Sequence, residues 1–155
     1  RPAVIDFDVH HGNGTQAAFA ADAALFYAST HQFPLYPGTG APDERGVGNI
    51  VNVCLAPGSG SSAFREAFTT QVMPALARFE PDFIFISAGF DAHTDDPLAN
   101  LALTDDDYAW ATGELMRYAD KHCAGRVVST LEGGYDLGAL RSSTTAHVRA
   151  LQSAI

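Results

Sequence analysis

Short, almost uninterrupted apolar segments constrain the fold of this chain more than any other feature. Phe83-Ile84-Phe85-Ile86 contains no polar residue, and apolar runs of this kind are typical of strands covered on both faces within a parallel sheet. Similar patterns predict five strands, at residues 3–10, 24–30, 49–55, 82–87 and 126–131.

Amphipathic segments follow the third, fourth and fifth of these strands and predict helices. The first has a predicted kink at Pro74. The second begins at Thr104, where Asp107 forms a variant of the capping box, and the third runs from about Leu137 to the end of the chain. The apolar stripes of the first and third are Phe64, Phe68, Val72, Leu76 and Phe79, and Leu140, Thr144, Val148, Leu151 and Ile155. This alternation predicts a three-layer α/β/α fold with a mostly parallel sheet.

Composition narrows the class of protein. The 155 residues are 46% hydrophobic and 17% charged, which is typical of one folded domain. The formal net charge of −9 argues against direct nucleic-acid binding and suits a cationic substrate. No apolar run approaches the roughly 18 residues that cross a bilayer, and Cys54 and Cys123 have neither zinc-knuckle nor redox spacing. We therefore expect a cytoplasmic protein without a membrane partner.

The chain enters its first predicted strand almost at once. Arg1-Pro2 precedes the strand without any polar lead-in, which is unusual for a natural domain. We therefore expect a fragment with an open apolar sheet edge at residues 3–10, which predicts poor stability or association into a homo-oligomer.

Polar residues gather where three predicted strands end, at residues 6–10, 91–96 and 132–135. Ligands bind at the carboxyl ends of the strands in parallel sheets. Asp6, Asp8 and His10 alternate with apolar residues and so share one face, where burial without a partner would be costly. A metal ion is one such partner, and the aspartates of residues 91–96 could complete its site. The alternatives are a strand end in solvent and a polar turn before Pro97.

Five motifs together resemble the histone deacetylase family, in its class II and acetylpolyamine branch. They are Asp6-Phe7-Asp8-Val9-His10-His11-Gly12-Asn13-Gly14-Thr15, Tyr36-Pro37-Gly38-Thr39-Gly40, Gly89-Phe90-Asp91, Asp96-Pro97-Leu98 and Leu131-Glu132-Gly133-Gly134-Tyr135. They follow the order of the family. The resemblance covers essentially the whole chain but only about the second half of the family's domain, so residues 1–155 are predicted to be the C-terminal portion of a single histone deacetylase-like domain.

The resemblance implies a role for each matching residue. Asp8, His10 and Asp96 match the three zinc ligands, which leave positions open for water and substrate. Further matches are to a structural potassium site (Asp6, Ser29 and Thr30), to the partner of a catalytic histidine (Asn13), and to substrate-binding positions (Tyr36, Leu103, Gly133 and Gly134). For Leu103, packing in the core is the alternative. Tyr135 matches the residue that donates its hydroxyl to the oxyanion.

The same resemblance implies a zinc-dependent amidohydrolase that removes acetyl groups from lysine side chains or polyamines. The family's tandem general-base histidines belong to a motif upstream of Arg1, and His11 belongs to the metal motif instead. The fragment alone is therefore predicted to be inactive. One alternative is a metal-binding or acyl-binding fragment without catalysis. Another is an arginase-like manganese ureohydrolase, which Asp91-Ala92-His93-Thr94-Asp95 resembles, although no second carboxylate-rich strand motif follows it.

Overall fold

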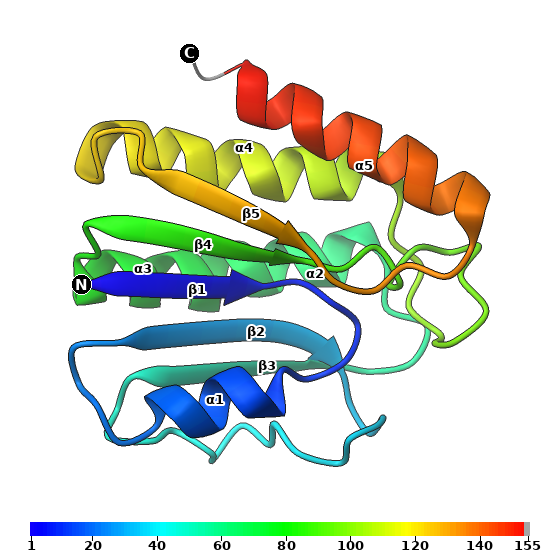
Figure 1. The fold of residues 1–155 in the computed structure, drawn as a ribbon. Helices are drawn as coiled ribbons and strands as arrows, with labels where there is room; N and C mark the ends of the chain where they lie inside the picture. The colour runs from blue at the N-terminus through cyan, green and yellow to red at the C-terminus, as the bar shows by residue number, and fades with distance from the viewer. Residues whose placement is uncertain (154–155) are drawn as a thin grey trace.

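Five parallel strands form one sheet in the order β3-β2-β1-β4-β5 (Figure 1). The structure is a computed structural model that describes residues 1–153. The strands are β1 (Pro2–Asp6), β2 (Phe26–Gln32), β3 (Ile50–Leu55), β4 (Phe83–Ala88) and β5 (Val127–Leu131). The predicted parallel α/β sheet is thereby confirmed.

The first strand ends at Asp6 rather than at His10 as predicted. Its backbone leaves the sheet because neighbouring carboxylates take up the amide groups: Asp8 N donates to Asp6 Oδ1 at 3.0 Å, and His10 N donates to Asp8 Oδ1 at 2.8 Å. Asp8 and His10 therefore lie in the connection that follows β1, while the alternating Phe7 and Val9 remain buried.

The first strand also lies in the middle of the sheet. Asp6 is opposite Ser29 of β2 on one side and Ser87 of β4 on the other. The prediction of an open edge at residues 3–10 is therefore wrong, and the edges of the described sheet are β3 and β5. The chain winds outward from β1 through β2 to β3 and then resumes at β4, so the strand order reverses between β1 and β4. Such a switch point is where parallel sheets bind ligands.

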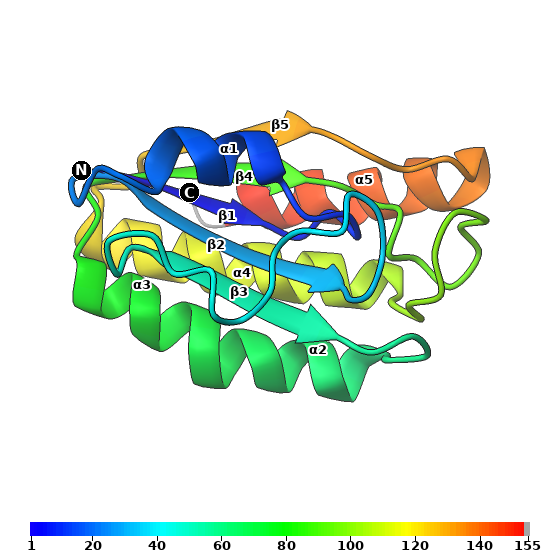
Figure 2. The same ribbon diagram turned by 90° about the horizontal axis from the view of Figure 1, so that it is seen from below.

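Helices cover the two faces of the sheet unequally. The helical segments are α1 (Asn13–Phe19), α2 (Ser61–Ala67), the π-helical η1 (Phe68–Val72), α3 (Met73–Phe79), α4 (Asp105–His122) and α5 (Leu137–Gln152). Figure 2 shows α1, which the sequence did not predict, on one face and α2, α3 and α4 on the other. On the side of α1, Phe85 and Val128 remain exposed. The expectation that the apolar run of β4 is covered on both faces is therefore only half correct.

The predicted helix with a kink at Pro74 is one helical run with a π-helical turn in its middle. Proline has no backbone N–H for an α-helical hydrogen bond, and the wider turn of η1 directly precedes α3, which has Pro74 in its first turn. The predicted apolar stripe is buried as expected. The capping box of Thr104 and Asp107 at the start of α4 is also confirmed. In the described residues 1–153, no helix combines the length and apolar character that a membrane crossing requires.

The most deeply buried face of the last helix lies beside the predicted stripe, of which Leu140 and Leu151 are partly buried against the core and Val148 is exposed. Its fully buried residues are Ala139, Ser143 and His147. The small side chains of Ala139 and Ser143 let α5 approach α4 closely. Leu140, Thr144 and Val148 of the predicted stripe also line a surface groove, together with the neighbouring Leu131 and Leu137. Ile155 lies outside the described residues.

His147 is a neutral histidine buried between α5 and the sheet. The Thr112 hydroxyl donates to the Tyr108 carbonyl at 2.6 Å, so it accepts from His147 Nδ1, also at 2.6 Å. The other ring nitrogen, Nε2, then accepts from the Ser129 hydroxyl at 2.8 Å. Burial lowers the pKa of His147 from 6.5 to about 4, since water no longer solvates the imidazolium form.

We expect His147 to make folding stability depend on pH. Between pH 6.5 and about 4, the unfolded chain binds a proton at this residue that the folded chain does not. The free energy of unfolding should therefore fall as the pH decreases, by about 2 kcal/mol between pH 7 and pH 5 from this residue. Urea unfolding at both pH values should show a smaller decrease for His147→Asn, while the exposed His122→Asn should behave like the unmodified chain. An identical decrease in all three proteins would contradict this.

Candidate metal centre

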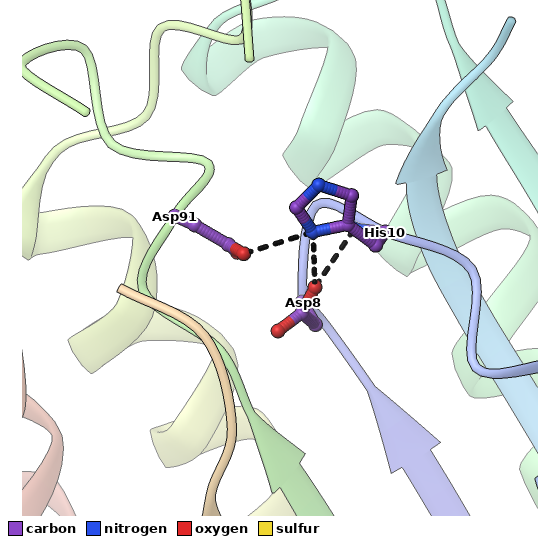
Figure 3. Close-up of side chains that lie close together, drawn as sticks. All are labelled: Asp8, His10 and Asp91. Carbon is purple, nitrogen blue, oxygen red and sulfur yellow. Dashed lines mark hydrogen bonds and ion pairs between the residues drawn. The ribbon is translucent and has the colours of Figure 1, made fainter. Parts of the chain in front are cut away.

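Three potential metal-ligand atoms meet at the switch point between β1 and β4. Asp8 and His10 follow β1, and Asp91 follows β4. His10 Nδ1 lies 3.1 Å from Asp8 Oδ1 and 3.0 Å from Asp91 Oδ2 (Figure 3). The three side chains offer donor atoms that all lie within 4.8 Å of one another. The predicted convergence of polar residues at the carboxyl ends of the strands is therefore present for these three.

Backbone amides orient both carboxylates of this cluster. Val9 N donates to Asp91 Oδ1 at 2.9 Å, which leaves Oδ2 directed at the imidazole. Gly133 N donates to Asp8 Oδ2 at 2.8 Å, which leaves Oδ1 for the same ring. A Cβ atom at Gly133 would overlap both carboxylates, so this position requires glycine. The chain thus fixes each carboxylate through one oxygen and presents the other to the centre.

The electrostatics of the cluster favour a cation. Hydrogen bonds in which Asp8 and then Asp91 accept from the ring raise the pKa of His10 from 6.5 to about 10, because two carboxylates stabilise a positive charge at Nδ1. Asp91 is only 1% exposed, and a buried carboxylate needs such compensation. One imidazole and two carboxylates form a donor set that suits zinc with further positions open. The residues present therefore fit the metal.

Asp96 is not part of this cluster, which corrects the predicted ligand set. Its Oδ2 accepts from Tyr135 N at 2.7 Å and from Asp136 N at 3.2 Å, and its Oδ1 accepts from Leu98 N at 3.0 Å. Both oxygens of the Asp96 carboxylate therefore already accept hydrogen bonds from backbone amides of the segments beside the pocket. Asp91 occupies the position predicted for Asp96, and Asp96 holds the backbone of Tyr135 instead.

A cavity of about 530 Å3 opens above the cluster. Its lining includes Tyr36 and Tyr135, whose side chains are exposed at the mouth, together with Gly133, as predicted. Leu103, predicted to bind substrate, is only 1% exposed and lies in the hydrophobic core. Leu98, which is 51% exposed, lines the cavity instead. Core packing is therefore the correct reading of Leu103.

One further prediction about substrate binding needs correction, and the pocket lining includes two more polar side chains. Gly134 was predicted to bind substrate, but a Cβ there would meet Leu140 and Phe90, so this glycine permits packing rather than ligand contact. The pocket lining also contains Glu132, from the predicted polar segment 132–135, and Ser87, which the sequence did not single out. The Ser87 hydroxyl donates to Glu132 Oε1 at 3.2 Å.

The predicted potassium residues lie together but are already paired in part. Asp6 Oδ2 accepts from the Tyr27 hydroxyl at 2.9 Å, and the Ser29 hydroxyl bonds to His31 Nδ1 at 2.9 Å. Burial and then the charge of Asp8 raise the pKa of Asp6 well above its usual range. Thr30 is buried, and Asn13 is exposed in the first turn of α1. The roles of these residues remain predictions.

A family model described as the histone deacetylase domain matches residues 1–151. The chain belongs to the histone deacetylase family. It is 47% identical over 152 residues to histone deacetylase 14, chloroplastic, of Arabidopsis thaliana, and the match covers 96% of this chain and 36% of that protein.

Solved structures of the histone deacetylase family share the fold described above. The HDA15 HD domain has a TM-score of 0.92 and 40% identity, with 99% of this chain and 44% of that one covered. An acetylpolyamine aminohydrolase from Burkholderia pseudomallei has a TM-score of 0.90 and 32% identity, with 99% and 45% covered. This chain therefore spans less than half the length of these histone deacetylase relatives.

Proposed function

We propose that this protein is a zinc-dependent deacetylase that hydrolyses the amide bond of acetylated lysine side chains or acetylated polyamines. The observation that carries the proposal is the Asp8–His10–Asp91 cluster at the floor of a cavity, in a chain of the histone deacetylase family. The negative net charge of −9 is compatible with a substrate whose product is a cationic amine.

On this proposal, some residues of the pocket bind the metal ion and others contact the substrate. Asp8, His10 and Asp91 would hold a zinc ion, which supplies Lewis-acid polarisation of the amide carbonyl and lowers the pKa of water. Tyr36 and Leu98 flank the substrate's stem at the mouth. Potassium at Asp6, Ser29 and Thr30 is a further proposal from family resemblance.

Tyr135 would donate its hydroxyl to the oxyanion that develops on the substrate carbonyl. Burial and then the charges of Asp91, Asp8 and Asp96 raise the pKa of this phenol from its ordinary value, which favours the protonated form that donates a hydrogen bond. The bonds from Tyr135 N and Asp136 N to Asp96 fix the turn that carries it.

We further propose that residues 1–155 form the C-terminal portion of one larger domain, and that the general base comes from the rest of it. Two observations support this: the chain covers 44% of the HDA15 HD domain, and Phe85 and Val128 expose apolar surface on β4 and β5. On this proposal the fragment alone is inactive, and it binds metal without catalysis. The manganese ureohydrolase alternative gains no support, because His93 faces Asp95 and Asp105, each at 3.7 Å, rather than the cluster.

The test is hydrolysis of an acetyl-lysine peptide and of an acetylated polyamine by the protein at its natural length, loaded with zinc. Tyr135→Phe should lower kcat about 100-fold or more with unchanged zinc content, because it removes one oxyanion donor. Tyr118→Phe, the same change far from the pocket, should leave kcat unaltered. Absence of turnover, or equal rates for both variants, would refute the proposed function.

A further inference from the structure

A line of hydrogen bonds behind the pocket connects the residue next to His10 with the loop that carries Tyr36. His11 is buried, and its Nε2 donates to Gln16 Oε1 at 2.8 Å. Gln16 Nε2 then donates to Glu44 Oε2 at 2.6 Å. Since His11 donates through Nε2, its Nδ1 accepts from the Thr39 hydroxyl at 2.8 Å. These hydrogen bonds therefore connect His11, next to the candidate ligand His10, with Thr39 and Glu44 of the loop that follows Tyr36.

Glu44 holds that loop by its backbone. The amides of Gly40 and Ala41 both donate to its carboxylate at 3.1 Å. On the opposite side, His31 Nε2 donates to the Gly40 carbonyl at 3.0 Å. Gly40 has a φ of +88°, and a Cβ there would overlap the rings of His11 and His31. Residues 39–41 are thus fixed from two sides, and only glycine fits between them.

Tyr36 depends on this anchor. Its side chain is 79% exposed, and it meets the His10 ring edge-on at a centroid distance of 6.4 Å. A single exposed aromatic contact contributes little orientation. The fixed residues 39–41 begin only three positions after Tyr36 and so limit the paths open to its backbone on that side, while Leu35 packs against the core on the other.

We propose that Glu44, acting through Gln16 and His11, is a positioning residue that holds the Tyr36 side chain over the metal-ligand cluster. Its position in turn determines how tightly the stem of an acylated amine binds. This rests on the proposed deacetylase function. Glu44 touches neither the cluster nor the cavity, so its effect belongs to substrate binding rather than to metal capture.

The kinetic test uses Glu44→Gln in the zinc-loaded protein at its natural length, with Asp43→Asn as the matched control. Asp43 is the exposed neighbour in the same loop, so both changes remove one negative charge. Glutamine has a single acceptor oxygen for the three donors that Glu44 now satisfies. We expect KM for an acetyl-lysine peptide to rise about fivefold in Glu44→Gln, with kcat and zinc content unchanged. Asp43→Asn should alter none of these.

A double-mutant cycle shows whether the effect passes through Tyr36. In a Tyr36→Ala background, Glu44→Gln should raise KM no further, because the aromatic side chain that Glu44 positions is absent. An undiminished rise, a fall in kcat at constant KM, or equal behaviour of Glu44→Gln and Asp43→Asn would overturn the inference. If Glu44→Gln does not fold, Gln16→Leu takes its place in the same cycle.

Limited trypsin digestion tests the hydrogen bonds between His11, Gln16 and Glu44 without an activity assay. Arg45 is an exposed cleavage site in the anchored loop. Cleavage after it should accelerate several-fold in Gln16→Leu and not in Ala17→Leu, an exposed neighbour on α1, because only the first releases the loop. If the unmodified protein hydrolyses no acetylated amine, the proposed function fails and this digestion alone decides: an unchanged cleavage rate in Gln16→Leu overturns the network.

Discussion

Replacing Asp91 by asparagine should lower the affinity for zinc about 100-fold or more, whereas Asp96→Asn should leave it nearly unchanged. Asp91 Oδ2 lies 3.0 Å from His10 Nδ1 inside the cluster, while both oxygens of Asp96 accept backbone amides. Asparagine at position 91 removes the negative charge that favours the cation. The two residues are five positions apart and undergo the same chemical change, so each variant controls for the other.

The measurement is competition for zinc against a chromophoric chelator, with cobalt absorption as a second readout of the coordination site. Asp96→Asn should affect Tyr135 instead, because it weakens the bonds that fix the Gly133–Tyr135 turn. Its predicted signature is a lower kcat at full zinc content. If Asp96→Asn loses zinc and Asp91→Asn retains it, the ligand set read from the structure is wrong and the assignment first expected from the sequence is correct.

Removing the carboxylate of Asp107 should decrease the free energy of unfolding by about 1.5–3 kcal/mol, because buried hydrogen bonds to a charged group are lost. This residue is fully buried and connects two helices: it accepts from Ser61 Oγ at 2.6 Å and Arg65 Nε at 2.8 Å of α2, and from Thr104 N at 3.0 Å at the start of α4. Asp107→Ala leaves the Arg65 charge without its partner and removes half of the capping box.

Asp106→Ala is the matched control, since Asp106 is the exposed neighbour in the same first turn. It removes an equal charge from the helix N-terminus, which is worth about 0.3–1 kcal/mol at an exposed site. Urea unfolding of both variants measures the difference. Equal losses would mean that the helix dipole, and not the buried network, accounts for the role of Asp107.

Much of the local structure could be predicted because it depends on neighbours in the sequence. The strand at Phe83–Ala88 and the start of α4 at Thr104 follow from a continuous apolar run and from capping chemistry. Helix α1 could not be predicted in this way, since Asn13–Phe19 begins with Asn-Gly and buries no residue. The buried face of α5 also escaped prediction: Ala139 and Ser143 are less apolar than Leu140 and Val148, and only the close approach to α4 makes small size decisive.

By itself, the sequence determined the kind of fold and the supply of ligands. It predicts a parallel sheet with acidic residues and a histidine at the ends of its strands, and the family motifs make Asp8 and His10 candidate metal ligands. Only the tertiary structure decided which aspartate after β4 joins them. Asp91 and Asp96 have the same side chain, but β4 lies directly beside β1. Val9 N, which follows β1, therefore donates to Asp91 Oδ1, which follows β4. A contact between residues 82 positions apart has no local signature.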